Sequence, residues 1–572
     1  MCHLYLNFSV KIPVNEKGIT KKTISGTTYI YYETGRTYDK VKKHTVPQTT
    51  TIGKQSEDDS ESMIPNTNYI KFFPDAELPE ELPSSSRSSC LKIGSYLVIK
   101  KVINYYKLDE MIRKIVGKNA GLFLDLAAYA IVTENNASQY YPDYAYCHPL
   151  FTEKMKVYSD SKISRFLRDV SRDDSIAFQN DWNIGRDHSE KIYLSYDSTN
   201  KHCQSGDIEL AEFGHEKEKQ HKRIYNFAIG YDVTYRVPAF YEQYPGSIND
   251  ISQLQFVLKK AEKYGYKEAG FILDRGYFSE ENIAFMDRNN YEFVIMVKGC
   301  KDLVNELILK VRGTFEDEWD KSIPYYDVNG TTVKSVLYPT DEQQRYFHIY
   351  YSDSRKAKER AELESNIRQD KEYLESLKKS EALPNIDKRY EKYFDLVYWH
   401  KGKPDQKLQF IRERKDVISR EIKLCGYFSI ITSREMTAEQ ALELYKSRDG
   451  SEKLFRGDKS YLGERSLRVN GDEPKDTKIF IEFVALIIRN KIYTCLKDRM
   501  KELKKKKNYM TVPAALKELN KIELIRQADG VYCMDHAVTA TQKDILRAFN
   551  MTATTVKNEA AELSKKLASL TN

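Results

Sequence analysis

The order of apolar and polar residues divides the first third of the chain into three segments. In residues 1–52, β-forming residues alternate with polar ones, as in TTYIYYETGRTY, which predicts a small β unit rich in hairpins. Residues 53–90 are acidic and rich in Ser and Pro, which is typical of a linker. In residues 91–186 the apolar positions recur at helical spacing, so we predict a compact helical domain that is a candidate for DNA binding.

Strands and helices alternate in the next segment, residues 187–299. The runs KIYLSYD, RIYNFAIGYDV and TYRVPAFYEQY predict three strands, and ISQLQFVLKKAEKYG predicts an amphipathic helix. AGFILD then predicts a buried strand, SEENIAFMDRNN a helix with Ser279 as its N-cap, and YEFVIMVKG a fifth strand. The fold class is therefore α/β, with helices on a mixed five-stranded sheet.

The pattern changes again between residues 300 and 424. Strand-like pieces surround a charged run, RKAKERAELESNIRQDKEYLESLKKSE, which predicts a solvent-exposed helical hairpin. We interpret this segment as an insertion domain. Strand character returns at CGYFSIITS, so residues 425–500 would complete the core, with residues 483–488 buried in it. Residues 501–572 predict a helical C-terminal region, for oligomerisation or for DNA binding.

Composition excludes several classes of protein. The chain has 572 residues, which is too long for one hydrophobic core, and a net charge of only +7, so affinity for nucleic acid must come from local clusters of charge. The eight cysteines include no C-x-x-C pair, which argues against a disulfide framework or a zinc ribbon. No apolar run approaches the about 20 residues that span a bilayer, and the N-terminus lacks a signal-peptide pattern. We expect a cytoplasmic protein with no membrane partner.

The candidate chemistry begins in the segment YKSRDGSEKLFRGDK. It carries four residues in the pattern Y-x2-R-x3-E-x6-K, namely Tyr445, Arg448, Glu452 and Lys459. A helix that starts at a capping box on Thr437 and stops at Gly457 would place the first three within about 60° of one another. Such a face combines a carboxylate with a guanidinium that can bind phosphate and a phenol. These groups suit cleavage of a nucleic-acid backbone beside a metal ion.

Two aspartates upstream extend this pattern. Asp197 follows the run KIYLSY and Asp274 follows AGFIL, each at the end of a strand-like segment. Taken singly, either aspartate could cap a turn, and Glu452 could be an ordinary surface charge. Taken together and in this order, they predict a site of three carboxylates. Asp449, three residues before Glu452 on the predicted helix, competes with it for the third position.

The three blocks resemble the insertion-sequence transposases of the DDE, ribonuclease H-like superfamily, in the branch called family four, whose signature is the Y-R-E-K spacing. The resemblance covers about residues 192–499, and its blocks are YDSTN, DRGYF and the segment from Tyr445 to Lys459. It implies a ribonuclease H-like catalytic core interrupted by an insertion domain. It favours Glu452 over Asp449, because the signature has no acid at the earlier position. The usual G-N-x-x-D block is replaced here by G-S-I-N-D at residues 246–250.

The resemblance also implies an activity. A transposase of this branch cuts DNA at the ends of its insertion sequence and joins the freed 3′ hydroxyl to target DNA, by cut-and-paste transfer. Two Mg²⁺ ions, replaceable by Mn²⁺, would be bound by Asp197, Asp274 and Glu452. By the same resemblance, the groups that contact DNA would be Tyr445, Arg448, Lys459 and Tyr277.

Several alternatives stay open at this stage. Tyr445 could be a core aromatic, and Tyr277 could either stack on a displaced base or pack under the sheet. The basic residues Lys162, Arg165, Arg168 and Arg172, like the lysines at 504–507, could contact phosphates or form solvated surfaces, and Arg489 could lie near DNA. The resemblance implies double-stranded DNA as partner, a homodimer on that DNA, and a bacterial cytoplasm at the nucleoid. Rival functions are a catalytically inactive relative acting as a repressor, and a ribonuclease H-like nuclease without strand transfer.

Overall fold

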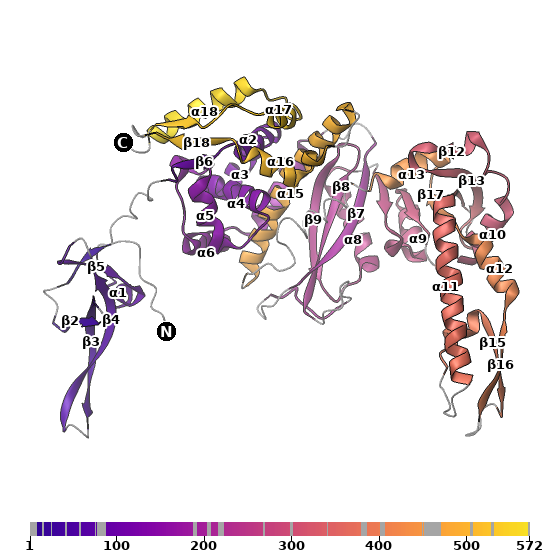
Figure 1. The fold of residues 1–572 in the computed structure, drawn as a ribbon, viewed down its shortest axis with the longest axis horizontal. Coiled ribbons are helices and arrows are strands. Elements are labelled where there is room, and N and C mark those ends of the chain that lie inside the picture. Colours follow the sequence, from indigo (N-terminus) through magenta and orange to yellow (C-terminus); the bar gives the residue numbers. More distant parts are fainter. Residues whose placement is uncertain are drawn as a thin grey trace. The chain divides into compact units, whose positions relative to one another are not determined.

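The computed structural model of the chain forms two compact units, residues 1–89 and residues 90–572 (Figure 1). Each unit is described by itself below. The structure describes residues 9–13, 17–24, 26–39, 43–56, 59–74, 76, 87–186, 191–202, 208–214, 222–266, 269–297, 301–339, 341, 343–378, 386–400, 406–448, 450, 469, 471–503, 507–527 and 531–569.

The first unit is an antiparallel sheet with the strand order β1-β5-β4-β3-β2 and one short helix, α1. Its elements are β1 (Val10–Lys11), β2 (Ile19–Ile24), β3 (Thr27–Asp39), β4 (His44–Gln55), β5 (Ser62–Pro65) and α1 (Thr67–Phe72). The last two lie in the segment that the sequence predicted to be a linker. Met63 of β5 is fully buried in the core of this unit. Asn66 lies just before α1 and caps it by accepting a hydrogen bond from the backbone N–H of Asn68.

The second unit begins with the predicted helical segment. Its helices are α2 (Gly94–Tyr106), α3 (Leu108–Val116), α4 (Ala120–Thr133), α5 (Tyr141–Cys147), α6 (Asp160–Asp169) and α7 (Arg172–Ile184). These helices share one hydrophobic core with the long helix α15 (Asp472–Leu503), so they do not form a domain with a separate core. Residues 483–488 are fully buried in that core, as predicted. Since α6 ends at Asp169 and α7 starts at Arg172, the four predicted basic residues do not share one helix face.

The stretch Leu108–Thr133 is long and apolar enough to cross a membrane by length and composition. This corrects the sequence expectation that no apolar run comes near that length. In the structure the stretch is broken at residues Gly117–Asn119, and 61% of its most apolar window is buried. Its second part, α4, packs Phe123 against Phe480 of α15, with ring centroids 4.7 Å apart. Burial in the protein core therefore accounts for its composition.

The C-terminal region packs on these helices. It consists of α16 (Val512–Leu519), β18 (Glu523–Arg526), β19 (Tyr532–Met534), α17 (Ala540–Arg547) and α18 (Ala553–Ala568). The sequence predicted helices only, whereas β18 pairs with both β19 and β6 (Cys90–Lys92) in a three-stranded antiparallel sheet. The two ends of the second unit are thus joined by strand pairing.

A nine-stranded mixed sheet forms the rest of the second unit, in the order β12-β13-β14-β17-β11-β10-β7-β8-β9. The five predicted core strands are all present, at β7 (Tyr193–His202), β8 (Ile224–Asp232), β9 (Val237–Pro245), β10 (Gly270–Leu273) and β11 (Glu292–Met296). They stand together in the sheet, and β7, β10 and β11 are parallel neighbours. The central strands β7 and β10 start side by side, and β10 ends at Leu273, opposite Tyr196 within β7.

The predicted insertion does not form a separate sheet of its own. Its strands β12 (Ser322–Ile323), β13 (Val328–Val336) and β14 (Gln344–Tyr351) continue the same sheet, joined to it through β17 (Tyr427–Thr432). The part that leaves the sheet is α11 (Asp353–Lys378) with the hairpin of β15 (Phe394–Trp399) and β16 (Lys407–Glu413), and the chain returns through α12 (Lys415–Leu424). The charged run is thus one long helix over its described residues.

Helices cover both faces of the sheet. One face packs against α8 (Asp250–Lys263), α9 (Glu280–Arg288) and α10 (Lys301–Val311). The other face packs against α15 over β8 and β9, and against α13 (Ala438–Lys446) over β10, β11, β14 and β17. Alternate residues of each strand point to opposite faces, so Leu273 packs under α8 and α9 while Ile272 packs under α13.

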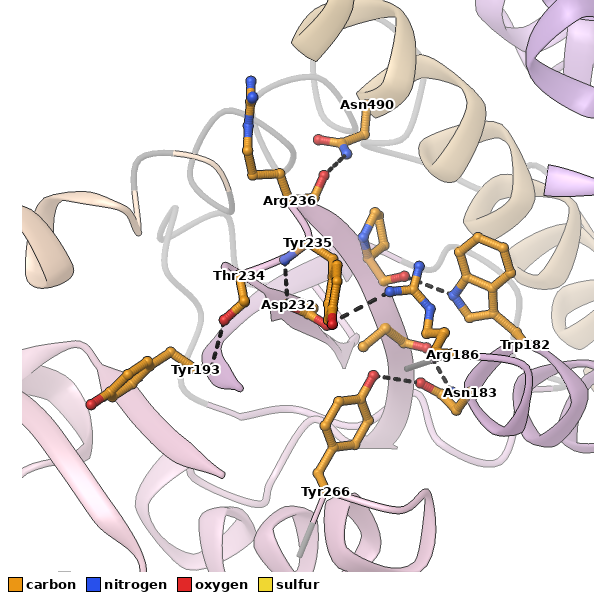
Figure 2. A network of polar contacts seen from close by, with 12 residues as sticks. Trp182, Asn183, Arg186, Tyr193, Asp232, Thr234, Tyr235, Arg236, Tyr266 and Asn490 are labelled. Atoms are coloured by element: carbon orange, nitrogen blue, oxygen red, sulfur yellow. Dashed lines mark hydrogen bonds and ion pairs between the residues drawn. The ribbon is translucent and has the colours of Figure 1, made fainter. Parts of the chain in front are cut away.

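A network of polar contacts anchors the helical segment to the sheet (Figure 2). The indole of Trp182 donates to the carbonyl of Pro238 at 2.9 Å, and the amide of Asn183 donates to the carbonyl of Ala239 at 2.9 Å. Arg186 lies over the Trp182 ring and 3.6 Å from the fully buried carboxylate of Asp232. The end of α7 is therefore fixed against the hairpin of β8 and β9.

Candidate active site

The two predicted aspartates are neighbours in the sheet. Asp197 lies within β7, and Asp274 directly follows β10. The register of these parallel strands pairs Tyr196 with Leu273, the residues that immediately precede the two aspartates. Adjacent strands are about 4.8 Å apart, and paired residues of parallel strands point to the same face. The fold therefore brings together two carboxylates that are 77 residues apart in the sequence.

The surroundings of Asp274 favour its charged form. The guanidinium Nη1 of Arg448 lies 2.7 Å from Oδ1 of Asp274. Burial would raise the pKa of Asp274, but the hydrogen bond and charge of Arg448, together with the backbone N–H of Arg275, bring it below its ordinary value. Asp274 is consequently an ionised oxygen donor near neutral pH. The sequence predicted Arg448 as a phosphate ligand, and the structure places it on a predicted metal ligand.

Asp197 is partly buried on the neighbouring strand. Its Oδ1 accepts a hydrogen bond from the backbone N–H of Ser198 at 2.8 Å. The strand that carries it is fixed a few residues further on, where the ammonium group of Lys201 forms a buried ion pair with Glu482 of α15. Lysine in a strand of buried residues signals such a partner, but the sequence does not show which carboxylate it is.

The helix before Arg448 begins as predicted but ends early. Thr437 caps α13 in a capping box with Gln440, which confirms the predicted start. The described helix ends at Lys446, and the backbone N–H of Arg448 donates to the carbonyl of Tyr445 in the turn that follows. The expected single helix through Tyr445 and Arg448 to Gly457 is therefore not formed in its described part. Residues 449 and 451–468, which include Asp449, Glu452, Gly457 and Lys459, lie outside the described residues.

Tyr445 occupies the core between α13 and the sheet. Its side chain is 6% exposed and packs in a cluster with Ile272 and Val294. The guanidinium of Arg448 lies over its ring, 5.2 Å from the centroid. This placement matches the alternative in which Tyr445 is a core aromatic. Its ring supports the guanidinium of Arg448.

Tyr277 is enclosed on the opposite face of the sheet. It is 2% exposed, and its ring centroid lies 5.4 Å from that of Tyr196. Burial, with the nearby charges of Asp250 and Asp197 among the further causes, raises the pKa of its hydroxyl well above the ordinary value. In this conformation the ring packs under the sheet, which was the alternative to base stacking.

Gly450 is a site residue that the sequence analysis did not single out. It lies against the ring of Tyr231, so a Cβ at this position would be 2.8 Å from the ring. Tyr231 pairs with Ser195 of β7, two residues before Asp197. The chain two residues before Glu452 is thus held beside the strand of Asp197. A glycine so close to a predicted catalytic acid is itself a signal of close backbone approach.

The structure also places two other predicted features. Arg489 is 8% exposed within the core around α15. The block at 246–250 forms the turn between β9 and α8, where Asn249 caps α8 and Asp250 accepts from the hydroxyl of Tyr244 at 2.6 Å. Within the described ranges, no group of three or more His, Cys, Asp or Glu side chains could hold a metal ion. Asp197 and Asp274 thus supply two of the three predicted carboxylate ligands.

Comparisons with known proteins identify the family of the chain. A family model described as "Transposase DDE domain" matches residues 189–488, which include both aspartates and Arg448. Among solved structures, the chain is similar to the piggyBac transposase in a synaptic complex with hairpin DNA, at 10% identity over 83% of this chain and 85% of that chain, with a TM-score of 0.34. A likeness at that level carries no argument about function. No curated protein matches the chain.

Proposed function

Because this chain belongs to the DDE transposases, whose domain spans residues 189–488, we propose that it is an active enzyme that cuts DNA at the ends of an insertion sequence and transfers the cut end to target DNA. The observation that carries the proposal is the placement of Asp197 and Asp274 at matching positions on adjacent parallel strands. A phosphodiester held at the end of β10, beside the middle of β7, would meet both carboxylates at once.

The donor set fits divalent magnesium. Carboxylate oxygens are hard ligands, which Mg²⁺ prefers and which Mn²⁺ also accepts, and a low pKa keeps Asp274 ionised. We assign Asp197, Asp274 and Glu452 as the ligands of two ions. Bound there, the ions would activate the attacking oxygen and neutralise charge on the phosphate.

The chain's own side chains would orient the substrate. Arg448 already lies beside Asp274, so a phosphate bound at that carboxylate is within reach of its guanidinium. We assign Arg448 and Lys459 to DNA phosphates, and Tyr445 to the support of Arg448. The Y-R-E-K spacing and the neighbouring central strands support membership of family four and a ribonuclease H-like core. Both remain parts of the proposal.

The partners follow from the reaction. Transfer of an element requires both of its ends, so we propose a homodimer bound to double-stranded inverted-repeat ends and then to target DNA. The proposed location is the bacterial cytoplasm, at the nucleoid. Inverted repeats that bracket the gene would provide the DNA substrate for the following test.

The test compares cutting, joining and binding in the full-length protein. With Mg²⁺ and end DNA, the wild type should release a 3′ hydroxyl and join it to target DNA. Asp197→Asn and Asp274→Asn should abolish both steps while end binding persists, and the exposed control Asp416→Asn should behave as wild type. Wild-type binding without cutting would instead indicate an inactive repressor, and cutting without joining a nuclease. Activity in either active-site variant would contradict the site.

A further inference from the structure

A cavity of about 430 Å³ lies between the end of α13 and the C-terminal half of α15. Its walls come from four parts of the second unit: α13 with the turn after it, α15, the end of β8 with the turn before β9, and residues 325–326 before β13. We call it the α13–α15 cavity. The residues that the argument uses are Tyr231, Arg236, Lys446, Gly450, Lys497 and Lys501.

The cavity opens beside the candidate active site. Tyr231 lines it and pairs with Ser195, which lies two residues before Asp197 on β7. At about 3.3 Å per residue, that separation along the strand is about 7 Å. On the other side, Ser447 and Gly450 line the cavity and flank Arg448, which contacts Asp274. A polymer held in the cavity would therefore continue toward the paired aspartates.

Positive charge dominates the described lining. Thr494, Lys497 and Lys501 stand at i, i+3 and i+7 on α15, so they share one helix face, and Lys446 faces them from α13. Among the described residues, no carboxylate lies within ion-pair distance of Lys446, Lys497 or Lys501. The described lining contains one acid, Glu443. Three ammonium groups thus share a concave surface with a single carboxylate.

The turn that closes the cavity is rigidly held. Arg236 has a φ of 57°, which is uncommon for a residue with a side chain. Its carbonyl accepts a hydrogen bond from the amide of Asn490 on α15 at 2.7 Å, as Figure 2 shows, and its guanidinium pairs with Asp498 at 2.9 Å. The strained turn is therefore fixed to the same helix that carries the lysines. Such a surface is preformed, so binding would require little ordering of this wall.

We propose that the α13–α15 cavity binds the sugar-phosphate backbone of the DNA strand that runs to the cleavage site. This inference rests on the proposed function, and it adds the path of the strand and the residues that hold it. Lys497 and Lys501 bind phosphates as point charges, and Lys446 binds the phosphate nearer the aspartates. These contacts set affinity and position without reading sequence.

The test uses the full-length protein and labelled end DNA without divalent metal, with affinity measured by fluorescence anisotropy over a series of salt concentrations. The slope of log affinity against log salt is negative, and each lost phosphate contact makes it shallower by about 0.9. The double variant Lys497→Gln/Lys501→Gln should therefore make the slope shallower by about 2. The matched control Lys358→Gln/Lys378→Gln removes two charges from the exposed helix α11 and should leave the slope unchanged.

A charge-preserving variant separates binding from folding. Lys497→Arg/Lys501→Arg should keep the wild-type slope, and all variants should keep the wild-type thermal midpoint. An unchanged slope in the glutamine variant, or the same loss in the control, would overturn the proposed strand path. Cleavage plays no part in these measurements, so a wild type that fails to cut DNA would refute the proposed function and leave this result intact.

Discussion

The buried ion pair between Lys201 and Glu482 gives the most quantitative prediction. Lys201 lies on β7, four residues after Asp197, and Glu482 lies on α15; their side chains are 1% and 2% exposed. The ammonium group of Lys201 also lies 4.7 Å from the centroid of the Phe227 ring. The pair therefore joins the strand of a predicted catalytic residue to the central helix of the core.

Removing one charge of the pair should destabilise the folded protein more than removing both charges. A buried ion that loses its opposite charge destabilises a protein by about 3–5 kcal/mol, whereas replacement of both ions by apolar residues is often neutral or stabilising. For a unit as large as residues 90–572, 1 kcal/mol corresponds to about 1 °C in the thermal midpoint. We expect Lys201→Met to lower the midpoint by about 3–5 °C, and Lys201→Met/Glu482→Leu to restore most of that loss.

The assay is thermal unfolding of the wild type, the two single variants and the double variant. The exposed pair of Lys358 and Glu362 on α11 is the control, and Lys358→Met should change stability by less than about 1 kcal/mol. Additive losses in the double variant would refute the coupling. If the single variants lose no more stability than Lys358→Met, that result would refute the burial of the pair.

Three further predictions concern the site. The lowered pKa of Asp274 stabilises the folded state above the unfolded pKa of about 3.9, and this is lost as pH falls through the folded pKa. The difference in thermal midpoint between wild type and Arg448→Gln should therefore shrink below about pH 4; a constant difference would contradict the ion pair. Thr437→Ala should destabilise α13 by about 0.5–2 kcal/mol and speed amide exchange at Gln440, whereas Thr437→Ser should not. Gly450→Val should displace the chain from Tyr231 and reduce cleavage by about 100-fold with DNA binding retained; undiminished cleavage would exclude the close approach.

Local sequence patterns predicted local features well. Asp197 and Asp274 were predicted because each follows an apolar run; Asp274 directly follows its strand as expected, whereas Asp197 lies within β7, which continues to His202. Ser279 and Thr437 were predicted as N-caps, and both accept hydrogen bonds from the backbone of the third helical residue. These features depend on a few consecutive residues, so they can be read without knowledge of the fold.

Features set by distant contacts could not be read in this way. The strands β13 and β14 join the core sheet through β17, and no local pattern specifies which sheet a strand enters. Arg448 was predicted on a helix face toward DNA, but α13 ends at Lys446 and the side chain turns to Asp274. The opposite charge at Asp274 lies 174 residues earlier, so helical periodicity alone could not predict that contact.

Direct bonding of Asp274 to a divalent ion is the central claim, and a change of donor atom tests it most directly. Asp274→Cys replaces oxygen by sulfur, which Mg²⁺ binds poorly and which Mn²⁺ accepts more readily. We predict that the variant does not cut end DNA with Mg²⁺ and regains cutting with Mn²⁺, while Asp274→Ser is inactive with either ion. Cutting by Asp274→Cys at the wild-type rate with Mg²⁺, or equal recovery of both variants with Mn²⁺, would contradict the metal site.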